Sequence, residues 1–176
     1  MRFTNTAIDG VVLIELEKKE DERGFFVRTW DDDEFKKQGL FTHIVQSNTS
    51  YNAKRGTLRG MHYQEAPYAE AKLVRCTRGA VYDVALDLRK DSPTFGKWFG
   101  VELSAEDWCM LHIPKGCAHG FQTLENNTEV FYNMDEPYRE SAGRSIRYDD
   151  PAFEITWPAA VSVISEKDRS YPNWKP

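Results

Sequence analysis

A histidine and an arginine occur close together in the segment LRGMHYQ, residues 58–64, inside a strand-like run. Lys72 and a second histidine, His119, occur in two other strand-like segments. Buried cations are costly unless something pairs with them, so several basic side chains near one another suggest a pocket for an anion. His62 therefore has three readings: a metal ligand, a group that moves a proton, or a histidine that only fills the core.

Small barrels of the cupin kind bind metals through two closely spaced histidines, a carboxylate and a later histidine. The spacing of that pattern is present here, and it places His62 and His119 at ligand positions. The other ligand positions hold Gln64 and Lys72. A lysine ammonium donates hydrogen bonds and has no lone pair for a cation. The two remaining histidines are too few for a closed divalent site, so we expect no metal.

Proton transfer is the next candidate chemistry. Histidine titrates near neutral pH, which makes His62 a natural general base for a carbon-bound proton beside a ketone. Lys72 is suited to stabilise the enolate oxygen that such a step creates. Tyr132, in TEVFYNM, is a candidate acid on the opposite face, and Asp168, in SEKD, is a candidate partner for the base. The residues alone predict an anion pocket with candidate acid–base groups.

The elements that must position these side chains are mostly strands. Short apolar runs bounded by glycine, proline, asparagine or aspartate predict strands at 11–16, 24–30, 42–48, 71–79, 80–88, 96–103, 109–114 and 128–134. In AVYDVALDL, residues 80–88, the alternation predicts a strand with one buried face. A short helix is expected at 31–39, and a helical turn from Ser104. This pattern favours one domain over residues 1–176, an antiparallel sandwich or small barrel with a ligand at its mouth.

Composition excludes several classes of function. The chain has 176 residues and a net charge of −5, which is unsuited to non-specific binding of nucleic acid. The longest aliphatic run, VVLIEL from Val11, is too short to span a bilayer, and we identify no signal peptide. The three cysteines lack the spacing of a zinc knuckle or a disulfide framework. We therefore expect a cytoplasmic protein with reduced cysteines and no contact with membrane or nucleic acid.

An ordered set of motifs covers almost the whole chain and resembles the dTDP-4-dehydrorhamnose 3,5-epimerase family. The segments are RGFF (23–26), QSNTS (46–50), LRGMHYQ (58–64), AKLVR (71–75), DVALDLRKDSPTFGKW (83–98), IPKGCAHGF (113–121), DDPAFEITWP (149–158) and SEKD (165–168). The resemblance implies an all-β fold, a cupin-type double-stranded β-helix (jelly-roll) barrel with short peripheral helices. It also implies a homodimer with exchanged N-terminal strands, a nucleotide-diphosphate sugar as substrate, and no metal or organic cofactor.

The resemblance assigns roles to individual side chains. His62 would abstract the protons that flank the keto group at sugar carbon 4, with Asp168 as its partner. Lys72 would stabilise the enolate, and Tyr132 would donate a proton from the other face. Substrate binding would involve Arg23, Arg28, Gln46, Asn48, Arg59, His119, Tyr138 and Lys167. The implied reaction is inversion of carbon 3, carbon 5 or both in a 4-keto-6-deoxy sugar, usually on the way to rhamnose-containing glycans.

Three positions depart from the pattern of the family. Arg28 and Gly143 stand where the family generally has glutamate, and Ser47 stands where it usually has aspartate. We therefore keep open a related nucleotide-linked sugar and inversion at only one carbon. Two other functions also stay open: a ketoisomerase that moves the carbonyl between carbons 3 and 4, and a barrel that binds a sugar nucleotide without catalysis.

Overall fold

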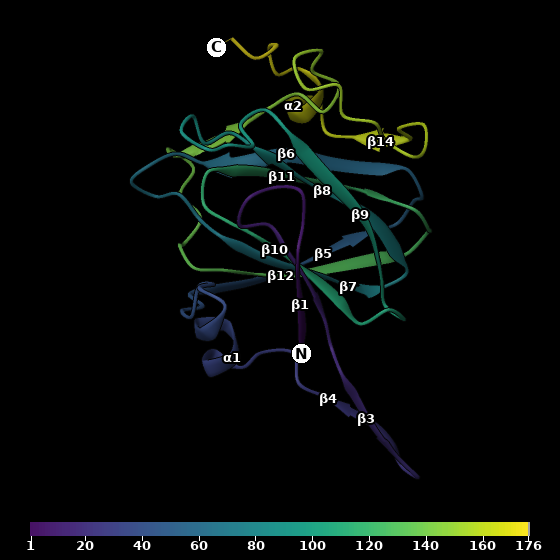
Figure 1. Cartoon of the computed structure of the whole chain (residues 1–176). Helices are drawn as coiled ribbons and strands as arrows, with labels where there is room; N and C mark the ends of the chain where they lie inside the picture. Colours follow the sequence, from purple (N-terminus) through teal and green to yellow (C-terminus); the bar gives the residue numbers. More distant parts are fainter. Residues whose placement is uncertain (176) are drawn as a thin grey trace.

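Two facing antiparallel sheets form a barrel in the computed structural model, which describes residues 1–175 (Figure 1). The first sheet has the strand order β1 (Arg2–Asn5), β2 (Val12–Glu15), β10 (Cys109–Ile113), β7 (Lys72–Arg78), β12 (Thr128–Met134) and β5 (Gln46–Asn52). The second has the order β13 (Gly143–Ser145), β6 (Thr57–Gln64), β11 (Cys117–Thr123), β8 (Ala80–Asp87) and β9 (Trp98–Ser104). The short strand β14 (Val163–Ile164) pairs in parallel with β6. The expected all-β, cupin-type barrel is confirmed.

The main core lies between the two sheets because their inward-facing residues are apolar. Side chains of β7, β10 and β12 meet those of β8 and β11 in one cluster. Its fully or almost fully buried members include Val74, Cys76, Val81, Ala85, Leu111, Ile113, Cys117, Phe121 and Val130. Branched and aromatic side chains at alternate positions suit this pleated surface, and their burial is the main stabilising contribution to the fold.

A short helix covers the outer face of the first sheet. The helix α1 (Asp32–Lys37) begins after Asp31, whose carboxylate accepts a hydrogen bond from the backbone N–H of Glu34 at 3.1 Å. Phe35 is completely buried in a second cluster, with residues of β2, β7 and β10. The helix expected at 31–39 is thus confirmed. Figure 1 shows α1 near the N-terminus, on the opposite side of the barrel from α2 (Glu166–Arg169).

Several local expectations were wrong. The segment from Ser104 forms a turn instead of helix, in which Trp108 adopts a positive φ of 54°. The strand expected at 42–48 begins only at Gln46. Both faces of β8 are buried instead of one. Asp83 and Asp87, which were expected on an exposed face, have no exposed surface. Their carboxylates are tolerated there because each one pairs with a basic side chain.

A two-stranded hairpin projects away from the barrel (Figure 1). It consists of β3 (Lys18–Asp21) and β4 (Gly24–Val27). Phe25 and Phe26, near its tip, are 48% and 62% exposed. Within residues 1–175, no helix has the length and apolar composition needed to cross a membrane.

Candidate active site

A pocket of about 910 Å³ contains most of the side chains that the sequence indicated. Strands from both sheets line it, together with α2. The sequence-predicted residues on its wall are Gln46, Asn48, Arg59, His62, Lys72, His119, Tyr132, Tyr138, Lys167 and Asp168. Arg23 and Arg28 do not belong to this wall, because they lie on or beside the projecting hairpin. Their predicted role in substrate binding stays a prediction, because the pocket of a single chain does not include them.

The strand β6 presents Arg59 and His62 to the same pocket although they are three positions apart. In a regular strand such residues point to opposite faces. Here the pairing of β6 with β11 shifts register between His119 and Phe121, which corresponds to a bulge. The bulge therefore brings both basic side chains to the pocket wall.

Two glycines allow the close approach of β6 and β11 at this bulge. Gly60 has a φ of 136°, a backbone conformation that favours glycine. A Cβ atom on Gly60 would lie 2.5 Å from the Cα of Gly120. Larger residues at either position would push the two strands apart and would separate His62 from His119, its cross-strand neighbour.

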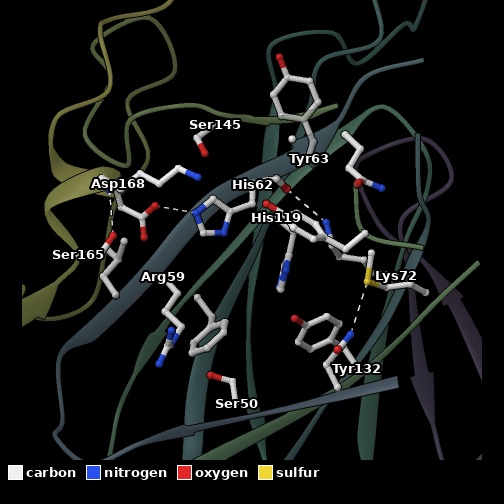
Figure 2. A pocket seen from close by; sticks show the side chains of 18 of the residues that line it. Ser50, Arg59, His62, Tyr63, Lys72, His119, Tyr132, Ser145, Ser165 and Asp168 are labelled. Carbon is white, nitrogen blue, oxygen red and sulfur yellow. Dashed lines mark hydrogen bonds and ion pairs between the residues drawn. The ribbon is translucent and has the colours of Figure 1, made fainter. Parts of the chain in front are cut away.

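His62 is hydrogen-bonded to a buried carboxylate from the C-terminal helix. Its Nε2 lies 2.6 Å from Oδ1 of Asp168, and Figure 2 shows the two side chains facing each other. The His62 side chain is 47% exposed, whereas Asp168 is only 7% exposed. Burial disfavours ionisation of Asp168, but the hydrogen bond and charge of His62 outweigh it and keep the pKa of Asp168 below its usual value. An ionised Asp168 fixes the imidazole ring and stabilises an imidazolium.

Lys72 and Tyr132 come from adjacent strands of the first sheet. Met134 is the register partner of Lys72, and Tyr132 lies two positions before it on the same face of β12. Lys72 donates a hydrogen bond from Nζ to the backbone oxygen of His62 at 3.3 Å. Burial raises the pKa of the Tyr132 phenol; Arg59 opposes this shift and Glu70 adds to it. Tyr132 therefore carries its proton at neutral pH. In Figure 2, His62 lies between Asp168 on one side and Lys72 with Tyr132 on the other.

His119 is held by a second buried carboxylate. Its Nε2 lies 2.8 Å from Oδ1 of Asp83, a residue of β8 with no exposed surface. The other carboxylate oxygen of Asp83 has no hydrogen-bond partner among the described residues. Asp83 does not line the pocket, so it orients His119 from behind the pocket wall; the Asp83 side chain is completely buried and that of His119 almost so.

Polar side chains of β5 and β6 also line the pocket. Gln46 and Asn48 lie two positions apart on the same face of β5. The Gln46 amide donates to Oδ1 of Asn48 at 3.0 Å. Gln46 also accepts a hydrogen bond from the backbone N–H of Tyr138 at 2.9 Å. The Arg59 guanidinium donates from Nε to Oδ1 of Asn52 at 2.7 Å. These groups offer hydrogen bonds and positive charge to an extended anionic ligand.

Some supporting residues were not found from the sequence. Ser165 begins α2 and accepts a hydrogen bond from the backbone N–H of Asp168 at 3.0 Å, which sets the direction of that carboxylate. The spacing S-x-x-D at 165–168 is a capping signal that could have indicated it. Asp83 was interpreted as part of an exposed face. Glu70, almost completely buried against Lys72, had no recognisable signal.

The three unusual positions lie in different surroundings. Arg28 forms an ion pair with Asp31 at 2.5 Å, beside the start of α1. Ser47 donates a hydrogen bond to Asn133 at 2.7 Å. Only Gly143 lines the pocket, next to the ring of Tyr138. In a single chain, therefore, only one of the three changes alters the pocket wall.

Comparisons with known proteins agree on one family. The family model of dTDP-4-dehydrorhamnose 3,5-epimerase matches residues 5–176. An enzyme of that name from Sinorhizobium fredii is 45% identical over 98% of this chain and 89% of its own. The crystal structure of such an enzyme from Bacillus anthracis with TDP and pyrophosphate has a TM-score of 0.94 at 40% identity, and covers 98% of this chain and 99% of that chain. A 3'-monoepimerase from Streptomyces bikiniensis in complex with dTDP-quinovose has a TM-score of 0.88 at 30% identity, covering 96% and 85%.

Proposed function

Because the chain belongs to the dTDP-4-dehydrorhamnose 3,5-epimerase family, we propose that it inverts carbon 3, carbon 5 or both of a nucleotide-diphosphate 4-keto-6-deoxy sugar. The first candidate substrate is dTDP-4-dehydro-6-deoxyglucose. The observation that carries this proposal is the pairing of His62 with Asp168 on one side of a pocket that also contains Lys72 and Tyr132. These are a base, a cation and an acid, which are the groups that inversion beside a ketone requires.

In the proposed reaction, the carbon-bound proton moves to the ring nitrogen of His62 that does not face Asp168. The electron pair of the broken C–H bond forms a carbon–carbon double bond, and the carbonyl oxygen at carbon 4 becomes an enolate. The Lys72 ammonium stabilises that oxygen, and the ionised Asp168 stabilises the imidazolium. The Tyr132 hydroxyl then delivers a proton to the opposite face of the carbon. The enolate returns to a ketone with inverted configuration at the carbon, and proton exchange with solvent then deprotonates His62 and reprotonates Tyr132.

Binding of the nucleotide diphosphate is assigned to the basic and polar residues of the wall. Arg59, Lys167 and His119 supply positive charge or hydrogen bonds for the diphosphate and sugar. Gln46, Asn48 and the exposed ring of Tyr138 are suited to the nucleoside.

We also propose a homodimer in which the N-terminal strands are exchanged. The hairpin β3–β4 projects from its own barrel with Phe25 and Phe26 exposed, as a segment that packs against another molecule would. In such a dimer Arg23 and Arg28 would reach the pocket of the partner subunit. This arrangement accounts for their predicted role in substrate binding and for their distance from the pocket of their own chain.

Inversion at a single carbon is a second candidate. The support for it is Gly143, which leaves the wall beside Tyr138 without a side chain, and the likeness to a monoepimerase. NMR analysis of the product tests the choice: two inverted centres support the double epimerase and one supports the single-carbon enzyme. A carbonyl moved to carbon 3 would identify a ketoisomerase. Tight binding with unchanged substrate after long incubation would identify a non-catalytic binding protein.

A further inference from the structure

Glu70 is a buried carboxylate at the edge of the pocket, and the mechanism above gives it no role. Its side chain is 3% exposed, and it pairs directly with the Lys72 ammonium, whose side chain is 9% exposed. One carboxylate oxygen accepts from Lys72, and the other accepts from the backbone N–H of Gln64 at 2.9 Å. A buried ion pair is retained only where its geometry and additional hydrogen bonds compensate for lost hydration.

The hydrogen bonds of Lys72 determine where its charge points. An ammonium group has three N–H donors. Glu70 takes one, and the backbone oxygen of His62 takes a second at 3.3 Å. One donor is then left for a ligand in the pocket. We propose that Glu70 is a positioning residue that holds the Lys72 ammonium so that this remaining donor meets the carbonyl oxygen of the substrate.

The same carboxylate connects the two sheets at the site. Lys72 lies on β7 of the first sheet, whereas Gln64 lies two positions after His62 on β6 of the second sheet. Glu70 contacts both, so it fixes the position of the cation relative to the strand that carries the base. The buried Gln64 amide donates to the backbone oxygens of Tyr68 at 2.9 Å and Pro137 at 3.3 Å. Gln64, whose backbone N–H binds Glu70, is therefore itself held in place.

Positioning of Lys72 requires the acceptor oxygen of Glu70 that faces the ammonium and not the charge of the carboxylate. A negative charge beside Lys72 opposes formation of an enolate, because it offsets part of the positive charge that stabilises the oxygen. A glutamine at this position removes the charge and keeps one oxygen acceptor, for Lys72, although its amide nitrogen cannot accept from the backbone N–H of Gln64. A leucine keeps the volume and removes every acceptor. Substitutions of Glu70 by these two residues therefore separate positioning from charge.

The inference rests on the proposed function of Lys72, so the test includes that residue. Lys72→Met is expected to lower kcat by about 100-fold or more, the size of effect seen when one donor to a developing oxyanion is lost. Glu70→Leu is expected to lower kcat at least about 10-fold with KM within about 3-fold, because the ammonium acts on the enolate more than on the bound substrate. Glu70→Gln is expected to retain kcat within about 3-fold.

A double variant shows whether Glu70 acts through Lys72. In Lys72→Met, the further change Glu70→Leu is expected to leave kcat unchanged, because there is no ammonium left to position. This variant also replaces both members of the buried pair with apolar groups, so it folds without an unpaired buried charge. Glu102→Leu is the matched control: it makes the same change at an exposed position of β9, outside the pocket.

The outcomes separate the inference from the proposed function. Unchanged kcat in Lys72→Met would contradict the role of Lys72 itself. A large loss in Lys72→Met with no loss in Glu70→Leu would overturn the positioning role of Glu70 alone. Equal losses in Glu70→Gln and Glu70→Leu, or a further loss when Glu70→Leu is added to Lys72→Met, would also overturn it. Melting temperatures near that of the unmodified protein are required of each variant that is compared.

Discussion

His62 and Asp168 lie 106 positions apart in the chain, yet Nε2 of one is 2.6 Å from Oδ1 of the other. The strand β6 supplies the histidine, and the short helix α2 supplies the carboxylate near the end of the chain. Ser165 fixes the first turn of that helix, so the carboxylate is directed at the ring. A preoriented pair of this kind costs no rearrangement during the reaction.

Replacing Asp168 with asparagine should test this pair. Asparagine keeps the shape and can still hydrogen-bond the ring, but it does not stabilise an imidazolium. We expect kcat to fall about 100-fold or more, with a small change in KM. Steady-state kinetics of Asp168→Asn beside Asp149→Asn, an exposed carboxylate, would measure the difference. Similar rates for the two variants would show that the charge of Asp168 is not used.

Replacing Tyr132 with phenylalanine should separate proton removal from inversion. Burial keeps the phenol protonated by raising its pKa, so Tyr132 is a donor at neutral pH. Without that hydroxyl, His62 can still remove and return the proton on one face. In D2O we therefore expect deuterium to enter the substrate in Tyr132→Phe while net inversion is lost. Loss of both exchange and inversion would contradict the assignment of His62 to one face of the carbon and Tyr132 to the other.

Mixing two inactive variants should test the exchanged hairpin. Arg23→Ala removes a hairpin residue, and His62→Ala removes the base. In a mixed dimer with exchanged hairpins, one of the two sites would combine an intact His62 with the partner subunit's Arg23. We expect activity to appear after the two variants are mixed, unfolded and refolded together. A mixture that stays as inactive as the separate variants, although dimers form, would contradict the shared site.

Protein stability should depend on pH through His112, which lies outside the pocket. His112 is buried on β10, hydrogen-bonded through Nδ1 to the backbone oxygen of Gly10 at 3.0 Å. Burial lowers its pKa from 6.5 to about 4, although the hydrogen bond and Asp135 oppose the shift. Between these values the unfolded chain binds a proton that the folded chain does not. The contribution of neutral His112 to the free energy of unfolding is therefore fully present above about pH 6.5, and it is lost as the pH decreases toward 4.

The expected loss is about 3 kcal/mol of unfolding free energy between pH 7 and pH 4, from the two pKa values. His112→Asn retains a side-chain donor for Gly10 and does not titrate. Its unfolding free energy, measured by denaturant titration at several pH values, should depend less on pH over this range. The variant will be less stable than the original protein at pH 7, and the gap should narrow at lower pH. Parallel pH curves for the two proteins would exclude His112 as the cause.

Local patterns predicted the strands, whereas the cupin-type barrel and most of the substrate-binding residues were implied by the resemblance to the family. Short apolar runs indicated strands such as 128–134, and the structure places Tyr132 of that strand on the pocket wall. Asp168 was already a candidate partner of His62 by residue type, and the resemblance assigned the pair, since no local pattern connects residues so distant. The charged residues of β8 were misjudged, because a period of two does not reveal that both faces of a strand are covered.

Other features depend on tertiary contacts that leave no signature in the chain. The bulge that brings Arg59 and His62 to one wall arises from a register shift against β11. Glu70 lies in a loop before β7, and only the fold shows that its carboxylate meets Lys72. Arg23 and Arg28 were predicted to bind the substrate, yet neither lines the pocket of its own chain. Placing them required the whole fold.

Proton exchange in D2O is the most direct test of the central claim that His62 removes protons beside a ketone. The experiment follows dTDP-4-dehydro-6-deoxyglucose by proton NMR with the purified protein and with His62→Ala. We predict that the signals of the protons on carbon 3, carbon 5 or both disappear with the unmodified protein and persist with the variant. Signals that persist with both proteins, or disappear equally fast with both, would contradict the account.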